Sequence, residues 1–389
     1  MTTSIPSEII NNELPSILGF TKEALEEFFV KHGHKTFRAK QVMQWIHQRF
    51  VNSFTEMTDL SKDLRVFVTE NFSFPCVEII KDQKSTDGTR KWLLKTSTGS
   101  AVEVVYIPEE TRATLCVSSQ VGCELNCQFC HTATQGFERN LSAAEIVSQL
   151  WFVNKTLFEE NLSLPKEQQS MLVSNVVFMG MGEPMRNLDA VIPAIKIMMD
   201  DFAYGLSKRR VTVSTSGVIP GIERLAQETD VALALSLHAP DDLTRSKIIP
   251  LNRKYPLEDL LPAVSAYLNH QDRKMHVTLE YVMLKDVNDS DKQAYTLAKL
   301  VNRYFPGQAK VNLIPFNPFP TTKFESSSYE VIRRFSDIVR SKGIITTIRK
   351  TRGQDIFGAC GQLAGDVLDK TRRRQQYLQK VSSVNNEVA

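Results

Sequence analysis

The sequence predicts an α/β fold, built on a largely parallel sheet or barrel that follows a small helical module. Two observations lead to this prediction. From about residue 111 to residue 348, short apolar runs alternate with segments whose apolar residues recur at helical spacing. The runs are almost continuously apolar, as in strands that helices cover on both faces, and such strands run parallel. In this architecture ligands bind at the carboxyl ends of the strands.

The composition excludes general disorder and gives only a weak indication of a partner. The chain has 389 residues, of which 42% are hydrophobic and 23% are charged, and these are ordinary proportions for a globular protein. The net charge is only +3, but residues 341–380 hold nine basic residues against three acidic ones. This basic end is a candidate surface for phosphate groups, and a solvated charged helix explains it equally well.

The first twenty residues have neither a basic leader nor a continuous apolar core, so they do not resemble a secretory signal. No stretch of the sequence reaches the roughly 18 consecutive apolar residues that a membrane-spanning helix requires. We therefore expect a cytoplasmic protein, in which thiols stay reduced. The six cysteines are accordingly not expected to form a disulfide framework.

Residues 1–100 are expected to form a separate, mostly helical accessory module. Apolar residues recur at helical spacing over residues 21–32 and 39–50, and Gly33 separates the two predicted helices. The residues at this break are basic or aromatic: Lys35, Phe37, Arg38 and Lys40. Basic residues at such a turn suit contact with RNA, although exposed lysines at a helix start are the commoner reason for the pattern. Short strand-like runs follow at residues 76–80, 91–95 and 102–107.

The core is expected over residues 109–348. Its candidate strands are the short apolar runs at residues 113–117, 172–179, 210–214, 231–237, 277–283, 311–315 and 344–348. The helix after the first of these strands begins with a capping box formed by Ser142 and Glu145. The polar stretch at residues 159–170 is predicted to be a surface loop within the same crossover. Residues 349–389 form a C-terminal segment.

The strongest chemical signal is the group Cys123, Cys127 and Cys130, placed directly after the first core strand and before the first core helix. Three thiolates on one tight loop can hold three irons of a cubane iron–sulfur cluster. The fourth iron is then left without a protein ligand, and an open coordination position is where a cofactor or substrate binds a metal.

Two other kinds of metal site use the same cysteines. A structural zinc site needs a fourth ligand and would have to take His131, although a ligand on the residue adjacent to a cysteine is not the usual spacing. Residues 127–131 also match the haem-attachment pattern C-x-x-C-H. That interpretation leaves Cys123 without a role and requires export, for which the N-terminus gives no signal.

Polar residues and glycines follow the other predicted strands at the points where those strands end. The segment GMGEP at residues 180–184 follows the second strand; its glycines let the backbone approach a ligand, and Glu183 offers an acceptor for an ammonium group. Hydroxyl, imidazole and amide groups stand at later strand ends, on Ser214, Ser236, His238 and Asn317. Alone each is more often a helix cap or a turn residue, but together they indicate one cofactor pocket.

On these residues the chain resembles the radical S-adenosylmethionine (radical SAM) superfamily, whose signature is this CxxxCxxC loop at the end of the first strand of a partial (β/α) barrel. The resemblance implies a partial barrel of the radical SAM type and a 4Fe-4S cluster held by Cys123, Cys127 and Cys130. It also implies that S-adenosylmethionine (SAM) binds the open iron. The residues implied for SAM binding are Gly182, Glu183, Ser214, Ser236, Leu237, His238 and Asn317.

Cys116 and Cys360 lie outside this cluster loop. Cys116 stands on the first core strand, where a buried cysteine usually acts as a small hydrophobic residue. Cys360 lies between glycines in the segment 358–365, with basic residues nearby that favour a thiolate. A loop of this kind can bring a thiol into a site. Cys76 matches no motif and is expected to be structural.

These two cysteines, with the segments FRAKQV (residues 37–42), RKTRG (349–353) and CGQLAG (360–365), resemble the RlmN/Cfr family of RNA adenine methyltransferases over nearly the whole chain. The resemblance implies methylation of carbon 2 of adenosine at the peptidyl-transferase centre of 23S rRNA, before subunit assembly, and in tRNA 3′ of the anticodon. Methylation at carbon 8, the reaction of the other branch of the family, uses the same cysteines and stays open. A different class of protein, a zinc-stabilised RNA-binding protein without catalysis, is the remaining alternative.

The family resemblance also implies a reaction path with two SAM molecules per turnover. Cys360 takes a methyl group from the first SAM by nucleophilic displacement, because carbon 2 of adenine is too electron-poor to do so. The second SAM is reductively cleaved to a 5′-deoxyadenosyl radical, which removes hydrogen from the methyl group on Cys360. The resulting carbon radical adds to the adenine and joins protein to RNA. Cys116 then attacks the Cys360 sulfur, and the disulfide that forms releases the methylated base, with Glu103 as the implied proton acceptor.

The substrate base must be unpaired, or flipped out of its stack, to reach such a site. The basic C-terminal segment and the N-terminal module are then expected to contact the RNA backbone. The resemblance further implies an electron-donor protein as a partner. We expect a monomer with no membrane contact.

Overall fold

The computed structural model describes residues 14–74, 77–271, 275–319, 322–365, 367, 371 and 375. Its main element is a sheet of ten strands in the order β1-β2-β3-β4-β7-β8-β9-β10-β11-β12. Neighbouring strands run parallel from β4 to β12, whereas β1 to β4 are antiparallel. The strands are Ile79–Lys84 (β1), Arg90–Lys95 (β2), Ala101–Pro108 (β3), Ala113–Cys116 (β4), Asn175–Phe178 (β7), Val211–Thr215 (β8), Ala232–Ser236 (β9), Val277–Met283 (β10), Ala309–Pro315 (β11) and Ile345–Ile348 (β12). The parallel core that the sequence predicts is therefore confirmed.

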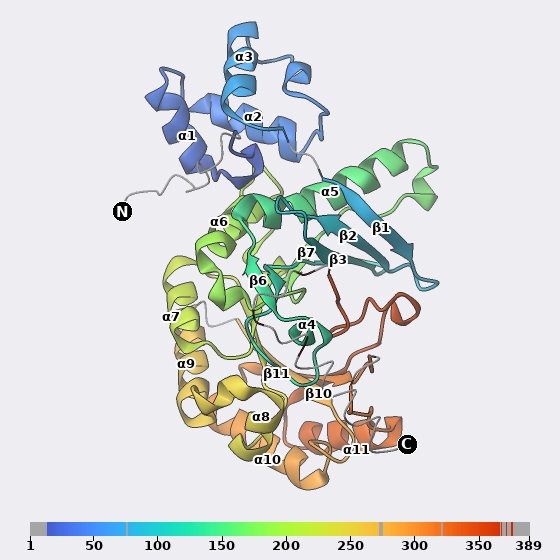
Figure 1. The fold of residues 1–389 in the computed structure, drawn as a ribbon. Coiled ribbons are helices and arrows are strands. Elements are labelled where there is room, and N and C mark those ends of the chain that lie inside the picture. Colours follow the sequence, from blue (N-terminus) through green and yellow to red (C-terminus); the bar gives the residue numbers. More distant parts are fainter. Residues whose placement is uncertain are drawn as a thin grey trace.

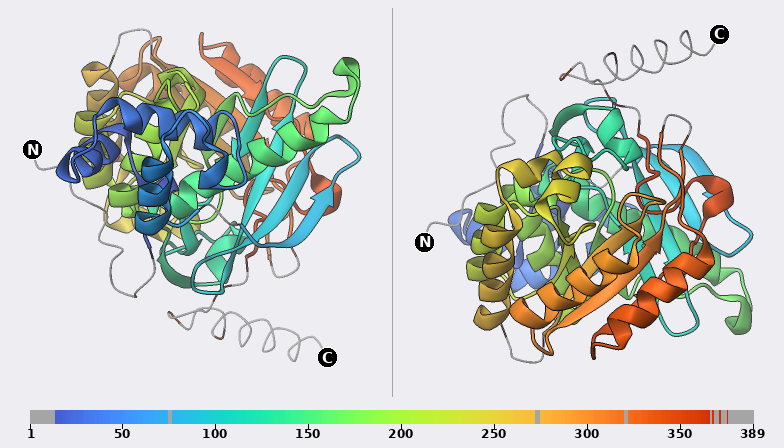
Figure 2. Two further views of the ribbon diagram at one scale, coloured as in Figure 1. Left: turned by 90° about the horizontal axis from the view of Figure 1, so that it is seen from above. Right: turned by 90° about the horizontal axis from the view of Figure 1, so that it is seen from below.

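Helices connect the parallel strands and cover the outer side of the curved sheet (Figures 1 and 2). They are Ala143–Leu162 (α5), Leu188–Met199 (α6), Ile219–Glu228 (α7), Asp242–Ile248 (α8), Leu257–His270 (α9), Asp291–Tyr304 (α10) and Tyr329–Arg340 (α11). The short helix α4 (His131–Thr134) lies instead in the segment between β5 (Gln120–Gly122) and β6 (Phe137–Asn140). Among the described strands, β1 and β12 stand at the two ends of the sheet and do not pair with each other, so the barrel is open. This is the partial (β/α) barrel that the resemblance implies. In the part of the chain that the structure describes, no helix is both long and apolar enough to cross a membrane.

Apolar side chains between the sheet and the helices fix the parallel strands. Val213, Leu233, Leu279 and Val311 come from four neighbouring strands, and each is at most 1% exposed. Burying one such aliphatic side chain stabilises the fold by about 1.5–3 kcal/mol. The carboxyl ends of these strands are therefore held on a rigid base.

Helix α5 begins at the predicted capping box. The Ser142 hydroxyl accepts a hydrogen bond from the Glu145 backbone N–H at 3.2 Å, and the Glu145 carboxylate accepts one from the Ser142 N–H at 3.0 Å. Two otherwise unpaired donors at the helix start are thereby satisfied. The helix continues to Leu162, so the loop predicted at residues 159–170 starts about one turn later. The last turns are supported by the packing of Phe158 on Phe50, whose ring centroids are 5.5 Å apart.

Three helices, α1 (Lys22–Lys31), α2 (Phe37–His47) and α3 (Lys62–Asn71), form the N-terminal module. The first two confirm the predicted helices, whereas the sequence does not predict α3. The module packs against the core beside α5 and α6 (Figure 1). The Trp151 indole N–H donates to the Ile46 carbonyl at 2.9 Å. Buried contacts of this kind hold the module on the core.

Strands β1 to β3 extend the core sheet and not the N-terminal module. β2 and β3 confirm the predicted strands, whereas the run predicted at residues 76–80 begins as a strand only at Ile79, and Cys76 lies outside the described residues. The register of β3 pairs Val105 with Cys116 of β4. The module boundary expected at residue 100 therefore falls inside a hairpin of the core sheet. Alternation along a strand indicates that it pairs, but the partner sheet depends on residues far away in the sequence.

Candidate active site

The carboxyl ends of the parallel strands surround a cavity of about 910 Å³. Ten residues singled out in the sequence line it: Cys123, Cys127, Cys130, Gly182, Glu183, Ser214, Ser236, His238, Asn317 and Cys360. Leu237 is buried between two of these lining residues, and its carbonyl accepts a hydrogen bond from Arg245 at 3.0 Å.

The loop with three of these cysteines is held between two short strands, β5 (Gln120–Gly122) and β6 (Phe137–Asn140). The backbone N–H of Cys123 donates to the Gly136 carbonyl at 2.8 Å, which closes the loop at its base. Gly122 has φ +76°, and a Cβ there would lie 2.2 Å from the Gly136 oxygen. Only glycine fits this position.

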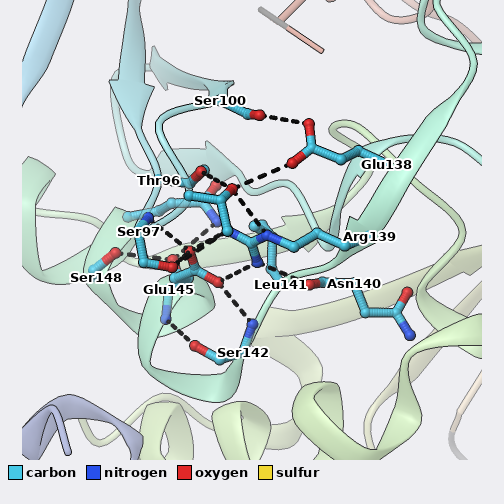
Figure 3. A network of polar contacts seen from close by, with 12 residues as sticks. Thr96, Ser97, Ser100, Glu138, Arg139, Asn140, Leu141, Ser142, Glu145 and Ser148 are labelled. Atoms are coloured by element: carbon cyan, nitrogen blue, oxygen red, sulfur yellow. Dashed lines mark hydrogen bonds and ion pairs between the residues drawn. The ribbon is translucent and has the colours of Figure 1, made fainter. Parts of the chain in front are cut away.

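A polar network fixes β6 to the start of α5 and to the turn between β2 and β3 (Figure 3). The Arg139 guanidinium donates to both oxygens of Glu145, at 2.7 and 2.8 Å, and Glu145 also accepts from the Ser97 N–H at 3.1 Å. Glu138 accepts from the Ser100 hydroxyl. Charge-assisted hydrogen bonds are stronger than neutral ones. The cysteine loop therefore ends on a firmly held strand.

Cys123, Cys127 and Cys130 are the residues that can hold the implied cluster. Burial raises the pKa of all three thiols, that of Cys127 to about 12, so they keep their protons until a metal displaces them. Among the described residues, no three His, Cys, Asp or Glu side chains converge closely enough to hold one metal ion. The three thiols line the cavity, so each can supply a thiolate to one iron of a cluster. His131, the fourth ligand of the zinc alternative, stacks on Phe319 with ring centroids 5.0 Å apart.

Glu183 offers a buried carboxylate to the cavity. Its two oxygens accept from the backbone N–H groups of Met185 at 3.2 Å and Ser216 at 2.9 Å. Burial raises the pKa of Glu183, and the neighbouring Arg186 forms its ion pair with Glu124 at 3.6 Å. A buried carboxylate is stable as an anion only beside a cation or strong donors. The ammonium group of SAM is a cation of the required kind.

His238 lines the cavity with a left-handed backbone, at φ 57°. Non-glycine residues in this conformation gather at functional sites. Its Nδ1 accepts a hydrogen bond from the Val282 N–H at 3.0 Å, so the proton of the neutral ring is on Nε2. Burial lowers the pKa of His238 to about 3, which keeps the ring neutral near pH 7. The side chain therefore presents a fixed N–H donor.

A second hollow, of about 470 Å³, adjoins the first, since Cys360, Arg349 and Asn317 line both. Cys116 of β4 lines this second hollow, and neither Cys116 nor Cys360 is in a disulfide. Cys116 is buried, whereas Cys360 is partly exposed. Burial raises the pKa of Cys116, and the nearby Cys360 adds to this effect while Arg349 opposes it. The fold thus brings together two thiols from distant segments, one accessible and one covered.

Arg349 and Glu280 line the cavity, and the sequence analysis does not single out either as a site residue. Proximity to Cys360 and to Glu280 raises the pKa of Arg349, against the effect of its burial. Glu280 accepts from the Asn312 side-chain amide at 2.8 Å; burial raises the pKa of Glu280, and Arg349 lowers it. The sequence holds a signal for both, because Glu280 interrupts the apolar run 277–283 and Arg349 follows the last strand directly.

Glu103 is buried on β3, and among the described residues it lines neither of the two cavities. Its carboxylate forms an ion pair with Lys91 at 2.7 Å and accepts from the Ala364 N–H at 2.8 Å. Lys91 also donates to the Phe357 carbonyl at 3.2 Å. Burial raises the pKa of Glu103, while Lys91 lowers it. The Lys91–Glu103 pair therefore fastens the chain on both sides of Cys360.

Comparisons with known proteins agree with this geometry. Residues 16–73 match the family described as the ribosomal RNA large subunit methyltransferase N-terminal domain, and residues 117–298 match the radical SAM superfamily. The chain is 50% identical over 371 residues to the dual-specificity RNA methyltransferase RlmN of Francisella tularensis subsp. mediasiatica, which covers 95% of this chain and 98% of that protein. It is 51% identical over 365 residues to the protein of the same name from Alkalilimnicola ehrlichii, with 94% and 98% covered. The solved structure of a radical SAM methyltransferase from Sphaerobacter thermophilus has a TM-score of 0.81 and 38% identity, with 90% of this chain and 99% of that chain covered.

Proposed function

The chain belongs to the family of dual-specificity RNA methyltransferases named RlmN, and from this premise we propose that it methylates carbon 2 of adenosine in 23S rRNA, at the peptidyl-transferase centre, and in tRNA, 3′ of the anticodon. Membership makes it a SAM-dependent radical methyltransferase with a 4Fe-4S cluster. One observation carries the proposed methyl-carrier path: Cys360 lines both the cavity of the three cluster cysteines and the hollow of Cys116. A methyl carrier needs the methyl donor on one side and a resolving thiol on the other.

Cys360 accepts the methyl group in the proposed reaction. Carbon 2 of adenine is electron-poor and does not displace a methyl group from a sulfonium, whereas a thiolate does. The new bond joins the Cys360 sulfur to the methyl carbon, and S-adenosylhomocysteine leaves with the electron pair of the broken bond. Arg349 stays protonated, because proximity to Cys360 raises its pKa, and a guanidinium beside a thiol stabilises the thiolate.

When bound, the cluster would supply the electron that cleaves a second SAM. The 5′-deoxyadenosyl radical from that cleavage would remove a hydrogen atom from the methyl group of Cys360. Residues of this chain hold the cluster and SAM in position. Cys123, Cys127 and Cys130 hold the cluster, and Glu183 receives the ammonium group of SAM. All four line the same cavity as Cys360, so the methyl group and its activator share one enclosure.

Cys116 resolves the covalent protein–RNA intermediate. This intermediate arises when the carbon radical adds to carbon 2 of adenine; the adduct gives up the ring proton and one electron, for which the bound cluster would be the acceptor. The Cys116 thiolate then attacks the Cys360 sulfur and a disulfide forms. The electron pair of the broken bond between that sulfur and the methyl-derived carbon goes to the adenine side, where uptake of a proton completes the methyl group. Burial disfavours the thiolate of Cys116, and Arg349 favours it. Glu103 is the proposed proton acceptor, because its strand pairs with the strand of Cys116. Since Glu103 lines neither of the two cavities described, the ring proton would reach it through a group that does.

RNA contacts are proposed for the N-terminal module and the basic C-terminal segment. Arg38 lies 4.6 Å over the ring of Phe37, whose side chain is 44% exposed. An exposed ring beside a cation is a surface on which a base can stack. The basic residues at 370, 372–374 and 380 lie outside the described residues. The remaining proposed partner is a one-electron donor protein, and the proposed working state is a cytoplasmic monomer.

An anaerobic assay with a short 23S rRNA fragment and with tRNA tests this function. We expect mass spectrometry of the nucleosides to show 2-methyladenosine in both RNAs. 8-Methyladenosine as the sole product would reject our proposal in favour of the carbon-8 alternative. The purified protein should be brown and hold about four irons per chain. A colourless protein with one zinc and no SAM cleavage would support a non-catalytic RNA-binding protein.

A further inference from the structure

Arg245 of α8 is a fully buried cation behind the wall of the SAM cavity. Its guanidinium donates hydrogen bonds to the carbonyl oxygens of Ser216 at 2.7 Å, Ser236 at 3.1 Å and Leu237 at 3.0 Å, and to the side-chain oxygen of Asn252 at 2.7 Å. Ser216 follows β8 and Ser236 ends β9, and both line the cavity. One side chain therefore ties together the ends of two neighbouring strands.

Among the described residues Arg245 forms no ion pair, although Asp242 and Cys127 lie near enough to raise its pKa against the effect of burial. All four acceptors are neutral oxygens, and none of the ion pairs formed in the described part of the chain includes Arg245. Asp242 accepts through Oδ1 from Asn252 at 2.8 Å and from the Leu257 N–H at 2.9 Å. Burial lowers the pKa of Arg245 to about 10, so the group is charged at neutral pH. A buried, unpaired charge is strongly destabilising, and a nearby anion would offset its cost.

The contacts of Arg245 lead toward the cysteine loop. The Ser216 N–H donates to Glu183 at 2.9 Å, and the Ser216 hydroxyl oxygen lies 3.9 Å from the Cys127 sulfur. The Gln128 N–H donates to the carbonyl of Ile248, the last residue of α8, at 2.9 Å. Arg245, Glu183 (the proposed partner of the SAM ammonium group) and the cluster loop thus belong to one hydrogen-bonded frame.

We propose that Arg245 is a positioning residue for this site, and that its charge is balanced by the anionic cluster with its thiolates. This inference rests on the proposed function, because it needs the cluster in place. A fixed positive charge stabilises the reduced cluster, which carries one more electron, over the oxidised one. Arg245 therefore eases one-electron reduction of the cluster by an external donor, and it also holds the ends of β8 and β9 in the spacing that SAM needs.

Redox titration of the anaerobically reconstituted protein, followed by electron paramagnetic resonance, tests the role of the charge. Arg245→Gln removes the charge and keeps an amide donor, and at a fixed potential we expect about a tenfold lower ratio of reduced to oxidised cluster, or 59 mV for a one-electron couple. Arg245→Lys keeps the charge and should titrate like the natural protein. Lysine lacks the planar guanidinium whose several N–H groups bond the ends of β8 and β9. SAM binding to the oxidised protein, measured by equilibrium dialysis, should therefore weaken about tenfold.

Arg90→Gln is the matched control, because it removes a guanidinium on β2 that pairs with Asp82 of β1 and Glu160 of α5. It should leave the potential unchanged. An Arg245→Gln protein with full iron content and the natural potential would overturn the charge role, and unchanged SAM affinity in Arg245→Lys would overturn positioning. If Arg245→Gln does not fold, the affinity of the Arg245→Lys protein for SAM decides whether Arg245 positions the site. Absence of iron in the natural chain would instead contradict the proposed function.

Discussion

Cys116 and Cys360 differ in their surroundings, and this difference supports the roles that we propose for them. Cys360 is partly exposed and lines the cavity of the cluster cysteines, so it can meet the methyl donor. Cys116 is buried on a strand and lines only the second of the two hollows described, where its attack on the Cys360 sulfur would take place. These surroundings support the proposal that the accessible thiol is the carrier and the covered thiol is the resolving group.

Replacing Cys116 by alanine should trap the covalent intermediate, because no thiol is left to resolve it. After anaerobic turnover with labelled RNA, we expect a protein–RNA adduct through Cys360 on a denaturing gel. The Cys116→Ala, Cys360→Ala double variant should keep its cluster and give no adduct. Free methylated RNA at normal yield from Cys116→Ala would contradict the resolving role.

Arg349 is expected to support the methylation of Cys360. Arg349→Met removes the guanidinium beside the thiol, and we expect single-turnover methylation of Cys360 to slow by about 10- to 100-fold. Arg349→Lys keeps a positive charge and should slow it less. Alkylation of Cys360 by iodoacetamide near pH 7 should follow the same order without any turnover. Equal alkylation rates in Arg349→Met and the natural protein would exclude this role.

The sequence pointed to the cysteines, to Glu183 and to the strand-end residues, but not to the partners of the charged groups around them. Loop spacing identifies ligands that lie on one short segment. Glu280 and Arg349 interact because β10, β11 and β12 are neighbours in the sheet, with Asn312 of the middle strand bonded to Glu280. The ion pair of Glu103 likewise depends on Lys91 of the next antiparallel strand. Such partners depend on tertiary pairing, which one sequence does not reveal.

The cysteine loop takes its shape from the two strands that enclose it. Gly122→Ala adds a Cβ that would lie 2.2 Å from the Gly136 oxygen, at a backbone with φ +76°. Gly33→Ala is the matched control, because Gly33 has φ +81° and nothing lies within 4 Å of an added Cβ. We expect the control to lose about 1–3 kcal/mol of unfolding free energy and to keep its iron.

Gly122→Ala should lose more stability than the control and should bind substantially less iron, because the clash displaces the base of the loop. Urea unfolding and iron analysis of both reconstituted variants measure the two effects. Full iron content in Gly122→Ala would show that the loop does not depend on this close approach.

The core strands follow from the sequence within a few residues, because near-continuous apolar runs bounded by polar turns fix their limits. Helix α3 does not follow in this way. It contains the β-branched residues Val66, Val68 and Thr69, which lower helix propensity. The helix forms because the Ser61 hydroxyl caps its first turn and because Leu64 and Val68 are buried. Tertiary burial here overrides a weak local signal.

The N-terminal module meets the rest of the molecule at a buried histidine. His47 of α2 lies with its Nδ1 3.0 Å from the hydroxyl of Tyr204, which follows α6. Burial lowers the pKa of His47 to about 3. Charging this histidine would place an unpaired cation inside the interface, so acid should weaken the attachment of the module.

The sign of the pH effect follows from this lowered pKa. Below about pH 6.5 the unfolded chain takes up a proton at His47, and the folded chain does not do so until about pH 3. The free energy of unfolding should therefore decrease as the pH is lowered through this window, by up to about 1.4 kcal/mol per pH unit for this group. In urea unfolding at several pH values, His47→Gln should show a slope that is shallower by that amount. If the unfolding free energy has the same slope against pH in His47→Gln and in the natural protein, His47 does not cause the loss of stability in acid.

The origin of the methyl group that reaches RNA is the most direct test of the whole reaction path. Protein that already carries an unlabelled methyl on Cys360 is given SAM with a trideuterated methyl group and RNA for a single turnover. Our proposal predicts that the first methyl group on adenine contains no deuterium from the methyl of that SAM, because it comes from Cys360. A trideuterated methyl group in the first product would show direct transfer from SAM and would contradict the role of Cys360.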